Sequence, residues 1–283
     1  MIYVGCSDKS LPPRLCENIP GWVNYTTLSH CWGSHSPLTT TAATLSARKM
    51  GIPLDTMPQT FRDAIRLTQY LEVEYLWIDS LCIVQDDDSD WTHEAERMGQ
   101  IYGSSCLTIA AVSAQDATQG LFSDRNTSHE ANIQSYPIFI RKAIDHLPFQ
   151  KPLASSREVN KFPLLNRKWC FQECLLSQRI INYTADEMVW QCQSLDHCEC
   201  GHLRTSTSTL RSRFTRVLKY QKPSFKYNPI WRDAVAPNIW TIWREITVQY
   251  STRVLTRETD MLPAIAGVAS EFAKAGAGRY VAG

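Results

Sequence analysis

The sequence lacks the features that mark a chain for a membrane or for nucleic acid. No stretch approaches the ~20 consecutive apolar residues of a membrane-spanning helix. The 29 basic and 28 acidic residues nearly cancel, so the composition gives no general nucleic-acid or anionic-membrane footprint. Residues 1–6 contain no basic region and no long apolar run, so we expect no signal peptide. We therefore expect a cytoplasmic protein without a membrane or nucleic-acid partner.

The common nucleotide-binding and hydrolase motifs are missing too. The chain contains no GxGxxG after a strand, no GxxxxGK[ST], no HExxH and no GxSxG. The acidic run at 86–90 lacks the glycine and the terminal glutamate of a calcium loop. It is better interpreted as the solvated start of a helix. No single short motif therefore assigns a reaction class.

What the sequence does contain is a large, aromatic-rich apolar fraction. Hydrophobic residues make up 43% and charged residues 20% of the 283 positions, which is typical of a globular protein of one or two domains. The nine tryptophans need burial beside a partner for the indole N–H. The ten cysteines are expected to be reduced thiols, because a chain with such a core does not need a disulfide framework.

Strand and helix patterns alternate over the first 111 residues. Apolar or β-branched runs at 22–28, 74–78 and 106–111 predict strands, and helical periodicity follows Pro58 and covers 91–102. Two helical crossovers between buried strands predict an α/β fold with a mostly parallel sheet and flanking helices.

The rest of the chain predicts additions to this sheet. Residues 113–165 are irregular, with one candidate strand at 138–140; the later elements expected are a helix at 169–176, strands at 179–183 and 188–192, and helices at 239–250 and 260–275. The basic stretch 193–230 is interpreted as an exposed connection. We divide the chain into a lead-in at 1–20, an α/β domain at 21–200, a basic connection at 201–230 and a helical annex at 231–283.

Three blocks of residues carry a family signal, at 25–33, 54–102 and 167–192. Their most specific parts are Ser29-His30-Cys31-Trp32-Gly33, Trp77-Ile78-Asp79-Ser80-Leu81-Cys82, and Arg167-Lys168-Trp169-Cys170-Phe171-Gln172-Glu173. In order and spacing these blocks resemble the fungal heterokaryon-incompatibility (HET) domain family over about residues 22–195. The segment at 250–267 also resembles a stretch that often follows this domain, so the nearby chain end suggests a short member or a truncated gene.

The resemblance implies non-self recognition and regulated cell death, acting through self-association or a protein partner. The HET domain has been likened to Toll/interleukin-receptor (TIR) domains, some of which cleave NAD. This comparison implies an α/β fold and makes NAD a candidate substrate, although likeness of fold does not assign chemistry.

The residues that follow the first two predicted parallel strands form one candidate site. Because the C-terminal ends of parallel strands meet at one crevice, Ser29, His30, Asp79, Ser80 and Cys82 are expected to face it together. A Cys82 thiolate assisted by His30 would give a Cys/His-dependent enzyme acting on an acyl metabolite. The alternative is that Cys82 packs as a small apolar residue and Asp79 caps a turn.

The helix at 169–176 supplies a second group. Trp169 and Glu173 lie four residues apart, so they share a helix face. A glutamate beside an aromatic ring suits a ribose hydroxyl, and Glu173 or Asp79 would then serve an NAD glycohydrolase. We assign Trp32, Arg167 and Gln172 to the same binding surface. The alternative is that Glu173 pairs with an arginine and Trp169 is part of the core.

One cysteine-rich stretch resembles a metal site. Cys192, Cys198, Cys200 and His202 offer the four sulfur or nitrogen ligands that structural zinc prefers. The single residue between Cys198 and Cys200 is shorter than the usual spacing, and reduced surface thiols are the alternative. No further cofactor follows from the sequence.

Overall fold

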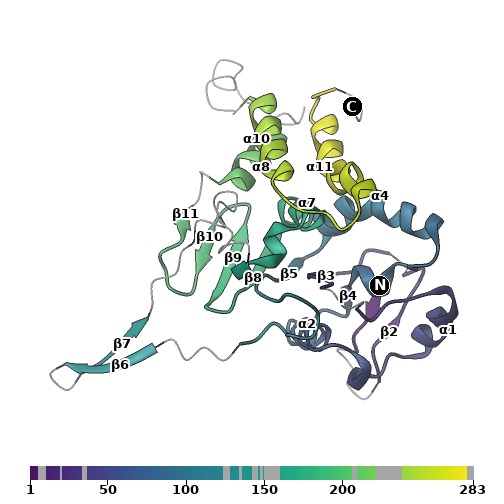
Figure 1. Cartoon of the computed structure of the whole chain (residues 1–283), viewed down its shortest axis with the longest axis horizontal. Helices are drawn as coiled ribbons and strands as arrows, with labels where there is room; N and C mark the ends of the chain where they lie inside the picture. The colour runs from purple at the N-terminus through teal and green to yellow at the C-terminus, as the bar shows by residue number, and fades with distance from the viewer. Residues whose placement is uncertain are drawn as a thin grey trace.

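The computed structural model places a long mixed sheet across the molecule, with helices on both of its faces (Figure 1). The structure describes residues 1–5, 11–19, 21–33, 37–123, 128–133, 136–141, 146, 149, 160–205, 209–220 and 238–278. Within these residues the main sheet has nine strands in the order β11-β10-β9-β8-β5-β3-β4-β1-β2. The strands of this sheet are β1 Ile2–Tyr3, β2 Arg14–Leu15, β3 Tyr25–Ser29, β4 Tyr75–Trp77, β5 Leu107–Ala111, β8 Arg179–Tyr183, β9 Met188–Cys192, β10 Asp196–Cys198 and β11 Arg204–Thr205.

The expectation of a mostly parallel sheet is wrong. The central strands β8, β5, β3 and β4 are parallel, as the crossover pattern predicts. The other five pairings among the described strands of this sheet are antiparallel, and they extend it at both edges. The connection from β8 to β9 explains the difference, since residues 184–187 can close a hairpin but cannot form a crossover.

The parallel centre is buried on both faces. Every residue of β3 and β5 is buried. The two strands carry threonines whose hydroxyls are paired inside the core: Thr26 with Thr68 at 2.7 Å and Thr27 with Thr108 at 2.8 Å. Buried hydroxyls without partners would be costly, so these pairs make a polar centre compatible with close packing.

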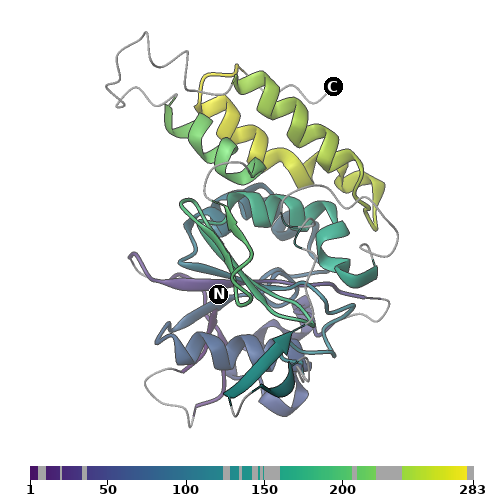
Figure 2. The same cartoon turned by 90° about the vertical axis from the view of Figure 1, so that its left-hand side faces the viewer.

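Helices cover the two faces according to the strand alternation (Figure 2). Leu76 and Ile78 belong to the core cluster that includes Phe61 and Ile65 of α2, while Trp77 packs with α4 on the opposite face. The helices are α1 Ala42–Met50, α2 Gln59–Tyr70, α3 Asp79–Cys82, α4 Asp88–Ser104, α7 Lys168–Leu176, α8 Leu210–Tyr220, α10 Ile239–Ser251 and α11 Pro263–Lys274, with 3-10 turns η1 Leu54–Thr56, η2 Pro163–Asn166 and η3 Glu258–Met261. Among the described residues, no helix combines the length and apolar character needed to cross a membrane.

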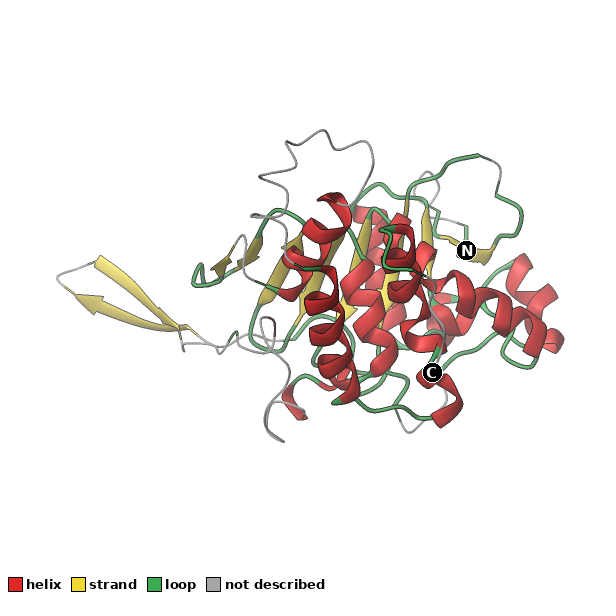
Figure 3. Cartoon of the chain, turned by 90° about the horizontal axis from the view of Figure 1, so that it is seen from above, coloured by secondary structure: helices red, strands yellow, loops and turns green. Residues whose placement is uncertain are grey.

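An outer layer of α8, α10 and α11 lies over α4 and α7 (Figure 2, Figure 3). The expectation that 193–230 is an exposed connection is wrong for its described part, because this part contains β10, β11 and α8. Leu210, Phe214 and Val217 of α8 are buried in the cluster that unites this layer. Basic residues stand between these apolar positions, one of them the buried Arg211, and they hid the helical pattern.

A separate hairpin leaves the main sheet between β5 and α7. It pairs β6 Ser128–Ile133 with β7 Tyr136–Arg141, and it projects away from the other strands (Figure 1, Figure 3). The strand predicted at 138–140 lies inside β7. The hairpin is an insertion, so the chain returns to the parallel sheet only at β8.

Candidate functional site

A cavity of about 360 Å³ lies where the chain leaves β3 and β4 and enters α7. Its walls include three indole rings, those of Trp32, Trp91 and Trp169. The last two meet edge to face, with ring centroids 6.4 Å apart. This is the carboxyl-end crevice that a parallel sheet provides for ligands. Its volume falls at the lower end of the ~300–1,000 Å³ range of small-molecule sites.

Glu173 is a buried carboxyl group in the wall of this cavity. It projects from α7, and its Oε2 accepts a hydrogen bond of 2.5 Å from the Ser29 hydroxyl at the end of β3. Burial and the charge of Asp79 raise the pKa of Glu173 to about 7, against the opposing effects of the Ser29 hydrogen bond and the Arg167 charge. A carboxyl group with this pKa exchanges protons near neutral pH, which suits general acid–base chemistry.

Asp79 is the second carboxyl group of the cavity wall. It begins α3 directly after β4, and its Oδ1 accepts from the Ser80 backbone N–H at 2.8 Å. Its Oδ2 accepts from the Trp32 indole Nε1 at 2.9 Å. These two donors fix the carboxylate at the C-terminal end of β4. Asp79 and Trp32 therefore hold each other in place on one side of the cavity.

His30 lies behind Asp79 and outside the cavity lining. Its Nδ1 is 3.7 Å from Asp79 Oδ1, too far for a hydrogen bond, and neither ring nitrogen has a hydrogen-bond partner among the described residues. Its ring packs edge to face on Phe61, with centroids 5.0 Å apart. Burial lowers the pKa of His30, against the opposing charge of Asp79, so the imidazole is held neutral.

Arg167 joins the two halves of the site. Its Nη1 donates to the His30 carbonyl oxygen at 2.7 Å, and its side chain lines the cavity together with that of Arg257. Cationic groups beside two carboxyl groups and three indoles suit a ligand with an anionic part, a sugar part and a planar ring.

The segment between α10 and α11 closes the cavity from the side opposite the sheet. The backbone N–H of Lys168 donates to the Val254 carbonyl oxygen at 3.1 Å. The backbone N–H of Val254 donates to the Asn166 carbonyl oxygen at 2.8 Å. Asp260 Oδ2 accepts from the Trp169 indole at 3.0 Å. The C-terminal part of the chain therefore orients a wall of the site and is not merely attached to it.

Comparison with known families identifies the part of the chain that forms the sheet side of this cavity. Residues 25–173 match the family model described as heterokaryon incompatibility protein (HET), and this range is more than half of the chain. The chain belongs to the HET family. No curated protein and no solved structure matches it. The likeness to TIR domains therefore stays a prediction.

The HET match begins at the first residue of β3 and ends at Glu173. It thus contains Ser29, Asp79, Arg167 and Glu173, which are the polar groups on the sheet side of the cavity. Val254 and Asp260 lie beyond it. In this HET protein the family segment supplies the two carboxyl groups, and the following helices supply the opposite wall.

Besides Ser29 and His30, three of the residues predicted for the site are absent from the cavity lining. Gln172 faces α11, where its Oε1 accepts from the Gly267 backbone N–H at 2.7 Å. Ser80 is fully buried and does not line the cavity. Cys82 is also absent from the lining, and burial raises the pKa of its thiol. The geometry thus brings Glu173 and Asp79 to the cavity but gives no support to a Cys82–His30 pair.

Sequence reasoning did not single out two residues of this site. Tyr102 donates from its hydroxyl to the Leu28 carbonyl oxygen at 3.0 Å and also interacts with Glu173. The one feature of the sequence that could have pointed to Tyr102 is its position as the last residue of the family block at 54–102. Asp260 lies in the stretch that resembles the segment often found after the domain. The resemblance includes this acidic residue but implies no role for it.

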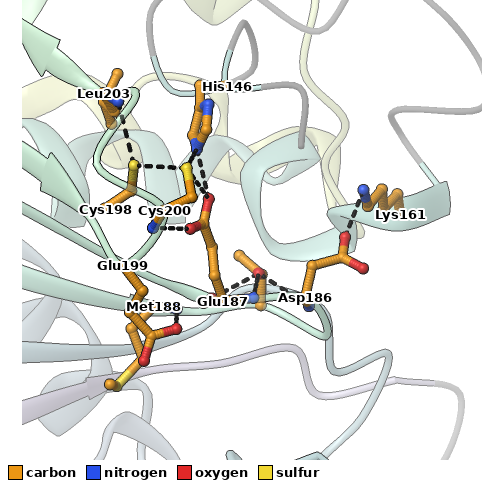
Figure 4. A network of polar contacts seen from close by, with 10 residues as sticks. His146, Lys161, Asp186, Glu187, Met188, Cys198, Glu199, Cys200 and Leu203 are labelled. Carbon is orange, nitrogen blue, oxygen red and sulfur yellow. Dashed lines mark hydrogen bonds and ion pairs between the residues drawn. The ribbon is translucent and has the colours of Figure 1, made fainter. Parts of the chain in front are cut away.

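The expected metal ligands are only partly brought together (Figure 4). Cys198 and Cys200 lie close to each other, but the groups beside them are His146 and Glu187. Cys192 donates instead to the Leu195 carbonyl oxygen at 3.3 Å. His202 does not belong to the group either.

Proposed function

We propose that this HET protein acts in heterokaryon incompatibility by hydrolysing NAD in the cavity between β3, β4 and α7. The observation that carries the proposal is the Glu173 carboxyl group, buried in the wall of an indole-lined cavity and tuned to a pKa of about 7. A cavity of about 360 Å³ suits the nicotinamide and its ribose, with the rest of the dinucleotide extending towards Arg257.

The proposed step breaks the C1′–N bond between ribose and nicotinamide. The bonding electrons leave with nicotinamide, which departs as a neutral molecule. Water adds to C1′ and gives its proton to the Glu173 carboxylate, so the products are nicotinamide and ADP-ribose. Asp79, held by Trp32, would stabilise the positive charge that develops on the ribose. The indoles of Trp91 and Trp169 would keep bulk water away and flank the nicotinamide ring.

The test is incubation of the purified chain with NAD, with nicotinamide release followed by chromatography. We expect release by the parent and a loss of roughly 100-fold or more in Glu173→Gln, because the variant cannot accept the proton. The rate should rise with pH through about 7, as the Glu173 carboxyl group ionises. Asp79→Asn should also be slow.

Two variants serve as controls. Glu271 is a glutamate on α11 that pairs with Lys274 and does not line the cavity, so Glu271→Gln should keep the parent rate. Cys82→Ala distinguishes the alternative enzyme, since its thiol would be essential to Cys/His chemistry. No turnover by the folded parent, or turnover abolished by Cys82→Ala and unchanged in Glu173→Gln, would remove the proposed site.

We propose that the incompatibility signal also involves self-association or a protein partner. The outward face of α10 exposes Trp240 and Val248, two large apolar residues in a helix whose other face is packed on the core. Sedimentation of the purified chain, compared with Trp240→Ser, measures whether this face contributes to association. The NAD assay should use the same range of protein concentrations, so that the rate of nicotinamide release can be compared with the degree of association at each concentration.

A further inference from the structure

Four side chains at the antiparallel edge of the sheet converge on one point. They are His146, Glu187, Cys198 and Cys200, and we name them the edge cluster. Each can offer one ligand atom, and all four of these atoms lie within 4.8 Å of one another. Figure 4 shows the imidazole, the carboxylate and both sulfurs pointing towards a shared centre. We propose that the edge cluster is a structural zinc site that fastens His146 to the edge of the sheet.

The interatomic distances within the edge cluster are those of ligands that share a small cation. The two sulfurs are 3.1 Å apart, and Cys200 Sγ is 3.5 Å from His146 Nε2. Cys200 Sγ is 3.8 Å from Glu187 Oε1, and that oxygen also contacts His146 Nε2. In a tetrahedral zinc site with bonds of ~2.0–2.3 Å, neighbouring ligand atoms lie about 3.3–3.8 Å apart. The cluster therefore needs adjustments of up to about 1 Å to hold the ion.

Backbone N–H groups point at two of the ligand groups. The Leu203 backbone N–H donates to Cys198 Sγ at 3.1 Å, and the Cys200 backbone N–H donates to Glu187 Oε2 at 3.0 Å. Backbone donors of this kind orient thiolate and carboxylate ligands from outside the coordination sphere. Glu187 is fully buried and Cys198 almost so, and a bound cation would balance the negative charge of the carboxylate and thiolate ligands there.

The local backbone is shaped for this arrangement. Cys198 ends β10, and the chain then turns sharply so that the Gly201 N–H donates to the Cys198 carbonyl oxygen at 3.0 Å. Gly201 has a φ of +75°, which a side chain would strain. The turn presents both sulfurs on one side despite the single intervening residue. Val189, Leu203 and Phe149 pack beside the two cysteines, of which Cys198 is buried and Cys200 partly buried.

Zinc fits this donor set better than other common ions. Two sulfurs and one imidazole nitrogen are soft and borderline ligands, whereas calcium and magnesium prefer oxygen alone; zinc also accepts the carboxylate oxygen that completes the set. Four protein ligands complete a tetrahedron, and this leaves no open position for a reacting water. The role is therefore structural, and it stands apart from the cavity that contains Glu173.

The strand register explains why the ligands differ from those expected on spacing alone. β10 pairs with β9 so that Cys198 lies opposite Val189. Cys192 is three residues further along β9, about 10 Å away at ~3.3 Å per residue. Cys192 is thus at the other end of the hairpin. His146 takes the place of His202 and comes from a segment 52 residues away from Cys198 in the chain.

The first experiment measures zinc in the purified full chain by mass spectrometry of the metal. We expect one zinc per chain, and roughly 100-fold or more weaker binding in Cys198→Ser/Cys200→Ser and in His146→Ala. Cys192→Ser and His202→Ala are matched controls on the same edge, and both should keep the zinc. Loss of zinc in these controls with retention in His146→Ala would overturn the assignment.

Two measurements on the parent chain need no variant to fold. Cobalt replacing zinc should give the intense visible bands of a tetrahedral ion and the near-ultraviolet absorption of thiolate ligands. Zinc should also protect Cys198 and Cys200, but not Cys192, from alkylation mapped by mass spectrometry. Absence of metal from the parent in zinc-containing buffer, equal alkylation of all three cysteines, or a Cys198–Cys200 disulfide in the metal-free form that zinc does not prevent, would each overturn the proposal.

Discussion

At the scale of single residues, Glu173 is held where its own charge is disfavoured. Burial and the nearby Asp79 oppose ionisation, while the Ser29 hydroxyl and Arg167 favour it. The balance leaves a carboxyl group near its midpoint at neutral pH. Groups tuned in this way reduce the stability of the folded state in exchange for reactivity. This loss of stability should be measurable as a change in the free energy of unfolding with pH.

Replacement of Glu173 by glutamine should remove a pH-dependent loss of stability. An acid whose pKa rises on folding, here from 4.5 to about 7, stabilises the folded chain below 4.5 and loses that contribution as the pH rises through about 7. The parent should therefore lose about 3 kcal/mol relative to Glu173→Gln between these limits. Urea unfolding across this pH range measures the difference. Parallel curves for the two proteins would contradict it, and Glu271→Gln should follow the parent.

The site residues that the sequence predicted well are those set by local geometry. The spacing of Trp169 and Glu173 predicts a shared helix face, and Asp79 follows a buried strand; the structure places all three in the cavity wall. His146 and Asp260 reach their sites from distant segments. Their positions depend on how the hairpin insertion and the C-terminal helices return to the sheet. A single sequence carries no signal for that.

At the scale of elements, the contact between α4 and α11 depends on two glycines. A Cβ added to Gly99 would lie 2.8 Å from Gly267 Cα, and one added to Gly267 would lie 2.8 Å from Gln172 Oε1. The two backbones therefore approach more closely than side chains allow. This approach places η3, and with it Asp260, beside Trp169.

Alanine at Gly99 should push α11 away from α4. Overpacking of this kind costs about 1–3 kcal/mol. Gly103 is one turn further along α4, and a Cβ there would meet only an ordinary contact of 3.7 Å. Gly103→Ala should therefore be neutral or stabilising by up to about 1 kcal/mol, because alanine favours the helix. Denaturant unfolding of both variants tests the pair, and equal effects would show that the close approach does not matter.

The bounds of helices and strands were easier to predict than the order in which the strands pair. The bounds predicted for β8 and β9 are confirmed. The helices predicted at 91–102, 169–176 and 239–250 lie within the observed α4, α7 and α10; α7 and α10 are each longer by one residue, and α4 is longer by three residues at its start and two at its end. Sheet order was not accessible in the same way, since it depends on which edges pair. The helix α8 was missed because basic residues surround its buried Leu210, Phe214 and Val217.

At the scale of the whole molecule, the HET segment and the C-terminal helices enclose one cavity. α11 packs on both α4 and α7, and the strand-like bridge between Arg167 and Val254 joins the two parts directly. Phe171 and Leu175 of α7 belong to the same core cluster as Ile246 and Val268 of the outer layer. The annex expected from sequence is thus continuous in packing with the family domain.

This continuity predicts one cooperative unfolding transition for the described parts of the chain. Ile246 of α10 is fully buried in the shared cluster, so Ile246→Ala should lower the free energy of unfolding by about 2–5 kcal/mol. Val248 is exposed on the same helix, and Val248→Ala should change it by less than about 0.5 kcal/mol. Tryptophan fluorescence, which includes the cavity indoles and Trp240 and Trp243 of α10, and far-ultraviolet circular dichroism, which reports on all helices, should shift together in Ile246→Ala. If the fluorescence change divided into two steps, one of them at the parent midpoint, the outer layer would be a separate unit. The cavity wall formed by Val254 and Asp260 would then be separable from the HET segment.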